Sequence, residues 1–162
     1  MSSEWVKLMA GLGLSDDEMK YIPNSALELY IHVTTKNVQV GTFLGSCIIG
    51  PMFRLIKGPR NAASFGRAFT RGGTRGALVG LVAGPLMTYA RIRNDPEPKV
   101  YDRSYRLRNN INQVTVDRCT YVGTLVGLAA TRSPLGLVCG IDGGLLAGAV
   151  YNNVIRAKQQ KA

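Results

Sequence analysis

Charged residues are scarce in this chain of 162 residues, at 19% against 46% hydrophobic residues. Acids are the scarcer sign, since ten Asp and Glu accompany twenty Lys and Arg and the net charge is +10. Such a chain can bind nucleic acid or an anionic membrane surface. Aromatic residues make up only 7%, no nucleic-acid-binding motif is visible, and the basic residues lie beside apolar stretches. We therefore expect a membrane surface and no nucleic acid.

Residue types that build catalytic and metal sites are equally few. His32 is the only histidine and has no partner visible in the sequence. Cys47, Cys119 and Cys139 each lie in or beside a different apolar stretch, without CxxC spacing. No nucleotide-binding loop and no Ser/His/Asp or Cys/His set is visible. We expect no enzymatic activity, no metal and no cofactor, with buried, unreactive thiols or, as the open alternative, an interhelical disulfide.

The N-terminal segment lacks the composition of a targeting sequence. Residues 1–37 carry five acids against three lysines, unlike a secretory signal or an Arg-rich transit peptide. An apolar helical face is formed by Trp5, Leu8, Met9 and Leu12. Ser15 and Glu18 have the spacing of a capping box. Residues 1–37 are predicted to be N-terminal extramembrane or surface helices that lie on the membrane, on a partner or on the bundle.

Long apolar runs are present in four places. The predicted spans are about 38–56, 76–92, 114–131 and 135–155, followed by a basic tail, 156–162. The third reaches a sufficient length only if it extends back to Val114. The polar connector before it is predicted to hold an amphipathic helix with an Asp102–Arg106 pair. The expected fold class is all-α: a membrane-embedded bundle of four glycine-rich transmembrane helices with short amphipathic helices outside the bundle.

Glycine is abundant, and 13 of its 19 copies lie in these apolar stretches. Most of them recur at four-residue intervals, and we assign helix packing to Gly41, Gly45, Gly76, Gly80, Gly84, Gly123, Gly127, Gly136, Gly140, Gly144 and Gly148. In lipid, glycine at this spacing allows two helix backbones to approach closely. The pattern therefore predicts a tightly packed bundle.

Two sets of charged residues remain as candidate sites. Asp142 is the one acid deep in a span, where an ionisable group suggests either a function or pairing with Arg118, Arg132 or backbone groups. Arg67, Arg71 and Arg75 would share one face of a helix. This row suits the phosphates of an anionic lipid, and a solvated basic loop is the alternative.

Two segments carry a family resemblance: RGGTRGALVGLVAG, from Arg71 to Gly84, and DRCTYVGTLVGLAATRSPLG, from Asp117 to Gly136. Together with four short glycine-ladder spans, a basic first connector and a tight third turn, they resemble the Tim (translocase of the inner mitochondrial membrane) superfamily. The likeness covers about residues 38–151. That superfamily includes import-channel subunits and a related membrane-arm accessory subunit of respiratory complex I. The short N-terminal segment makes the accessory subunit the closer match.

The resemblance implies a multi-pass protein of the mitochondrial inner membrane, acting as a non-catalytic structural accessory subunit of the complex I membrane arm. Its expected partners are other membrane subunits and an anionic lipid such as cardiolipin. The alternatives are a pore or scaffold subunit of a protein-import translocase and a lipid-interacting bundle outside mitochondria. A pore would require convergence on one concave face of Gln39, Thr42, Ser46, Thr88, Thr120, Thr124 and Asp142.

The orientation in the membrane is an open question in the sequence. With four spans, thirteen Lys and Arg lie on the side of the termini and seven on the other side. The positive-inside rule therefore places the termini in the matrix. The Tim resemblance implies the intermembrane space, and we adopt that orientation as the expectation.

Overall fold

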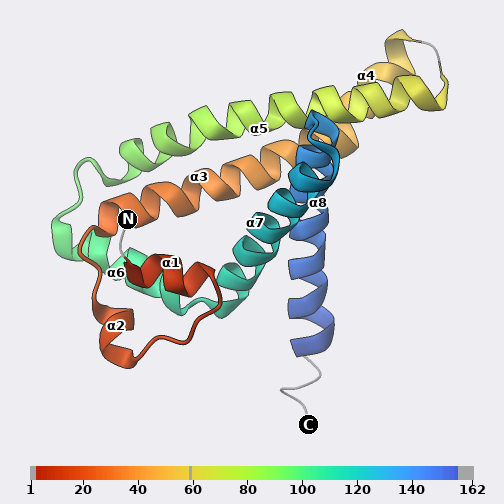
Figure 1. Ribbon diagram of the computed structural model, residues 1–162. Coiled ribbons are helices and arrows are strands. Elements are labelled where there is room, and N and C mark those ends of the chain that lie inside the picture. Colours follow the sequence, from red (N-terminus) through yellow and green to blue (C-terminus); the bar gives the residue numbers. More distant parts are fainter. Residues whose placement is uncertain (1–2, 59, 157–162) are drawn as a thin grey trace.

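The computed structural model describes residues 3–58 and 60–156, and every regular element in these ranges is helical (Figure 1). The elements are α1 (Ser3–Met9), α2 (Asp16–Lys20), α3 (Ser25–Phe43), η1 (Leu44–Ile49), α4 (Gly50–Lys57), α5 (Ala62–Ile92), α6 (Glu97–Asn109), α7 (Ile111–Thr131), α8 (Pro134–Val150) and η2 (Tyr151–Arg156). The all-α class expected from the sequence is confirmed.

The long helices form two antiparallel hairpins. The continuous helix α3–η1–α4 lies beside α5, and α7 lies beside α8 (Figure 1). The second hairpin meets the first near the end of α3, where the Ser46 hydroxyl reaches Asp142 of α8. A Cβ added to Gly73 of α5 would lie 2.5 Å from a methyl group of Val138 on α8, so the backbone of α5 touches the second hairpin here.

Glycine sets the distance between the helices of each hairpin. In the first hairpin, Gly41 faces Gly76 and Gly45 faces Gly72, each so closely that an added Cβ would collide with the opposite backbone. In the second, a Cβ on Gly140 would lie 2.9 Å from the Cα of Thr124. At each of the eleven glycines to which the sequence assigns packing, an added Cβ would come within 3.0 Å of a neighbouring group. These are the close backbone approaches that small residues permit.

Helix boundaries differ from the spans predicted by sequence in three places. Asn24 caps α3 by accepting a hydrogen bond from the Leu27 amide (3.0 Å), so the helix begins at Ser25 and includes residues predicted to lie outside the bundle. Asn61 caps α5 in the same way, and the basic connector from residue 62 onward is helical. Helix α7 begins at Ile111, one turn before Val114, where the third span was predicted to start.

A π-helical turn, η1, joins α3 to α4. The Gly50 amide donates to the Gly45 carbonyl, five residues earlier, instead of four. Pro51 follows directly, and because it has no N–H it cannot donate to the Cys47 carbonyl. A wider turn before such a residue is a common way of adjusting a helix without ending it. The helix therefore continues to Lys57.

The N-terminal helices and α6 pack together at one end of the hairpins (Figure 1). The capping box is confirmed, since the Glu18 amide donates to Ser15 Oγ (3.3 Å) and the Ser15 amide donates to Glu18 Oε2 (2.9 Å). The Asp102–Arg106 pair on α6 is confirmed as well. Arg108 of α6 binds the Glu28 carboxylate and donates to the backbone carbonyls of Glu18 in α2 and of Tyr21 just after it. The end of α6 thereby holds the start of α3.

The distribution of polar and apolar side chains is inverted relative to a water-soluble protein. Among the described residues, seven hydrophobic residues are buried, compared with eleven polar or charged ones, while 29 large hydrophobic residues are exposed. Such extensive exposed apolar surface marks contact with lipid or with other proteins. Two helical stretches, Ser25–Lys57 and Pro134–Arg156, are long and apolar enough to cross a membrane. Arginines lie at both ends of the apolar part of α5. In α7, which is a continuous helix, Asp117 and Arg118 interrupt the apolar sequence.

Candidate functional site

A buried polar cluster joins α3 to α7 around the carboxylate of Asp117. Lys36 Nζ lies 2.6 Å and Gln39 Nε2 lies 3.0 Å from Oδ1, and His32 Nδ1 lies 3.1 Å from Oδ2. Gln39 also donates to Thr120 Oγ1 (3.0 Å). The three α3 residues are four and three positions apart, so they lie on one face of the helix. The sequence-based view that His32 has no partner is wrong, because that partner lies 85 positions away along the chain.

The Asp117 cluster is a buried ion pair between Asp117 and Lys36 with further hydrogen-bonding neighbours. The Asp117 side chain is 3% exposed, against 15% for His32 and 24% for Lys36. Each carboxylate oxygen has a partner, which is the condition under which a buried charge is tolerated. The arrangement ties α3 of the first hairpin to α7 of the second.

A second contact between the hairpins involves Asp142, which is 5% exposed. Ser46 Oγ donates to Asp142 Oδ2 (2.6 Å), and the other carboxylate oxygen has no hydrogen-bond partner. Pairing with Arg118 or Arg132, which the sequence leaves open beside a functional role, is not found between these residues in the structure. Arg118 donates instead to the Leu8 carbonyl (2.7 Å), and Arg132 is exposed at the turn where α7 ends. Asp142 lies more than two helical turns into α8, where it meets Ser46 of η1 instead of either arginine.

The polar residues that a pore would require do not share an open face. Six of them are buried: Gln39, Thr42, Ser46, Thr88, Thr120 and Asp142. The hydroxyls of Thr42, Thr88 and Thr124 donate to carbonyls of their own helices. Thr88 and Thr124 border two different cavities. The other members form hydrogen bonds across the contact between the hairpins.

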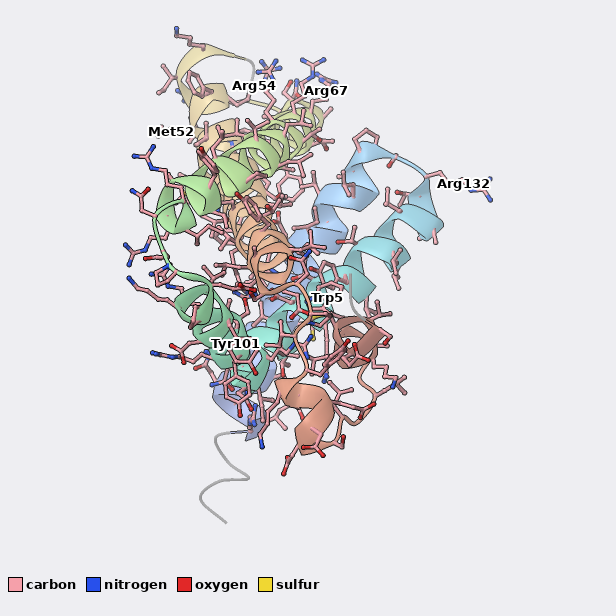
Figure 2. All side chains as sticks on the ribbon, turned by 90° about the vertical axis from the view of Figure 1, so that its left-hand side faces the viewer. Trp5, Met52, Arg54, Arg67, Tyr101 and Arg132 are labelled. Carbon is pink, nitrogen blue, oxygen red and sulfur yellow. The ribbon has the colours of Figure 1, made fainter. Side chains whose placement is uncertain are left out.

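A basic groove lies between α4 and α5, at the end of the first hairpin away from α6 (Figure 1). Its cavity of about 280 Å³ is bordered by five basic residues: Arg54, Lys57, Arg67, Arg71 and Arg75. Figure 2 shows Arg54 and Arg67 extending at the same end of the molecule. The structure thus brings the predicted arginine row together with two cations of α4 that the sequence-based prediction did not include.

The thiols do not follow the sequence-based prediction. All three cysteines are free, and Cys47 and Cys139 are exposed while Cys119 is half-buried. Buried thiols were expected because cysteine packs well in protein interiors. Here glycine and hydrogen-bonded polar residues occupy the inward positions of the hairpins, and Cys47 and Cys139 face outward.

A family model described as "Protein of unknown function (DUF1757)" matches residues 5–151. The chain belongs to this family. In this member of DUF1757, the match extends from α1 to the end of α8, so it includes both polar contacts and the basic groove. No curated protein matches the chain.

In this DUF1757 protein, the sequence contains a pattern that indicates the Asp117 cluster and that the sequence-based prediction did not use. His32, Lys36 and Gln39 have helical spacing within a helix that is otherwise largely uncharged. A polar stripe on an apolar helix predicts an inward face when the exterior is apolar. The partner on α7 carries no comparable signal in the sequence.

Proposed function

We propose that this protein is a non-catalytic structural subunit of a mitochondrial inner-membrane assembly, and specifically an accessory subunit of the membrane arm of respiratory complex I. The resemblance of the segments Arg71 to Gly84 and Asp117 to Gly136 to the Tim superfamily supports this proposal. The same resemblance supports the localisation.

The observation that carries the proposal is the inverted distribution of side chains. Hydrogen-bonded polar residues and glycine fill the contacts between helices, while apolar side chains cover the outside. A rigid bundle with this exterior can pack against lipid and against other membrane subunits. The buried polar residues are used in holding the hairpins together, which leaves the apolar outer faces for partners.

The proposal includes four membrane spans. The stretches Ser25–Lys57 and Pro134–Arg156 have the length and composition of spans by themselves. We propose that α5 and α7 cross beside them, because glycine contacts pair α5 with α3 and α7 with α8. In α7, pairing of Asp117 with Lys36 and His32 lowers the cost of placing its charge between helices.

A pore or scaffold subunit of a protein-import translocase is the second candidate, supported by the same resemblance. It has less support, because the residues required for a polar concave face form hydrogen bonds inside the bundle. A scaffold role without a pore remains compatible with the fold.

Native gel electrophoresis of mitochondrial membranes containing the tagged full chain tests the proposal. We expect the tag to migrate with NADH dehydrogenase activity and to be recovered with complex I after affinity purification. Deletion of the chain should reduce the amount of assembled complex I and leave import of a matrix precursor unchanged. Migration with an import translocase and an import defect would favour the second candidate. Migration with neither assembly would contradict both.

A further inference from the structure

We propose that the basic groove between α4 and α5 binds the phosphate of an anionic phospholipid headgroup. Arg54 and Lys57 of α4 lie three positions apart, and Arg67, Arg71 and Arg75 of α5 lie four apart, so each set shares one face of its helix. All five border the same cavity. This inference rests on the proposed placement in a membrane and not on membership of any particular complex.

The groove has donors but no internal counter-charge. The chain contains no acid between Glu28 and Asp95, and none of the five cations forms an ion pair with a carboxylate in the described part of the chain. Arg54 Nε is buried and has no hydrogen-bond acceptor. Clustered like charges destabilise a protein unless a counter-ion binds between them. Phosphate oxygens meet this need, since guanidinium groups bind them through paired hydrogen bonds.

Apolar neighbours favour a lipid over a soluble phosphate. The α4 residues next to these cations have exposed side chains, with exposed fractions of 50% for Met52, 58% for Phe53, 50% for Leu55 and 68% for Ile56. Phe53 also borders the cavity. Helix α4 ends one of the two stretches that are long enough to span a membrane, which places the groove at headgroup level. Acyl chains can therefore contact the apolar side chains while the phosphate contacts the arginines.

Native mass spectrometry of the purified full chain in detergent tests the inference. It measures the binding of three probes: phosphatidylglycerol, phosphatidylcholine and inorganic phosphate. We expect phosphatidylglycerol to bind in preference to phosphatidylcholine. Replacing Arg67, Arg71 and Arg75 together by Gln should lower the association constant for phosphatidylglycerol on the order of 100-fold, since each interfacial cation contributes roughly a fivefold factor. The binding of phosphatidylcholine should not change.

A matched control variant removes three positive charges outside the groove. Lys20, Arg93 and Arg132 are exposed, lie outside the groove and form no ion pair in the described part of the chain. Their triple replacement by Gln should change the association constant less than about twofold. Equal losses in both triple variants would show a general effect of net charge and would overturn the site.

A second variant and a competition experiment complete the test. If the α5 triple variant does not fold, the pair Arg54→Gln and Lys57→Gln decides, with an expected loss on the order of 25-fold. Unchanged binding in a folded pair variant would overturn the groove. Displacement of phosphatidylglycerol by inorganic phosphate at equal concentration would overturn the lipid assignment and indicate a soluble phosphate ligand. These results come from purified protein, so they are independent of whether the chain joins complex I.

Discussion

Replacement of Gly80 by Leu should separate the two helices of the first hairpin. Gly80 of α5 lies against the turn of α3 that contains Asn37, and an added Cβ would lie 2.5 Å from the Asn37 carbonyl carbon and 2.7 Å from the Val38 nitrogen. Carbon atoms pack at about 3.5–4.0 Å, so the Cβ alone requires the helices to move apart by roughly 1 Å. The rest of the leucine side chain requires more.

The free-energy cost follows from this displacement. Inserting atoms into a closely packed contact typically costs about 1–3 kcal/mol, and the loss of neighbouring glycine contacts places this substitution near the upper end. Gly140→Leu should behave similarly in the second hairpin, since its added Cβ would lie 2.9 Å from the Cα of Thr124. The loss in the free energy of unfolding is measured by unfolding the purified chain with increasing SDS in mixed micelles, followed by circular dichroism.

Gly143→Leu and Gly66→Leu are matched controls. An added Cβ meets nothing within 4 Å at either position, and Gly143 lies on the same helix as Gly140. The free energies of unfolding of both control variants should lie within about 0.5 kcal/mol of that of the unmodified protein, as is usual for surface substitutions. If Gly80→Leu and Gly143→Leu proved equally stable, the argument that glycine contacts hold each hairpin together would be wrong.

Two further predictions concern contacts outside the glycine ladders, and a third concerns the orientation in the membrane. Asp117→Asn should destabilise the bundle by roughly 1–3 kcal/mol, and adding Lys36→Met should recover part of that loss because it removes the unpaired cation; SDS unfolding of the single and double variants measures both. Hydrogen bonds from Lys7 and from the Ser15 amide lower the pKa of Glu18 from 4.5 to about 2, so the Glu18 carboxylate stabilises the α1–α2 contact fully above about pH 4.5 and loses its contribution as the pH falls toward 2. Fluorescence of the single tryptophan, Trp5, should change in that interval and lose the corresponding component in Glu18→Gln, and an identical titration of the variant would contradict the assignment. Both termini are expected in the intermembrane space, so protease should remove a C-terminal tag from mitoplasts; protection of the tag would support the matrix orientation given by counting basic residues.

Much of the helical organisation could be predicted from the sequence, because the signals are local. The four-residue glycine spacing identifies the faces along which helices approach, and the Ser15–Glu18 capping box identifies the start of α2. Helix ends were harder to predict. The polar residues of α3 suggested a segment outside the bundle, although nothing between Ser25 and Asn37 interrupts a helix.

The side-chain pairs between the hairpins could not be predicted, because they depend on where two separate hairpins cross. His32 and Asp117, or Ser46 and Asp142, are far apart in the chain, and their meeting depends on a crossing angle that no local pattern encodes. Arg54 illustrates the same limit. It lies near the end of the first predicted span, about 38–56, and only the packing of α4 on α5 places it beside the arginine row.

The bundle is held by two different kinds of contact, so substitutions at each kind should separate different helices. Within each hairpin, backbone meets backbone through glycine between helices that are close in sequence. Between the hairpins, hydrogen bonds join polar side chains, with those of Asp117 and of the Ser46–Asp142 pair as the principal examples. A hydrogen bond between side chains can be removed without disturbing a backbone, whereas a glycine contact cannot be widened without moving a helix. Substitutions at Asp117 or Ser46 should therefore loosen one hairpin from the other and leave each hairpin paired, while Gly80→Leu should open the first hairpin itself.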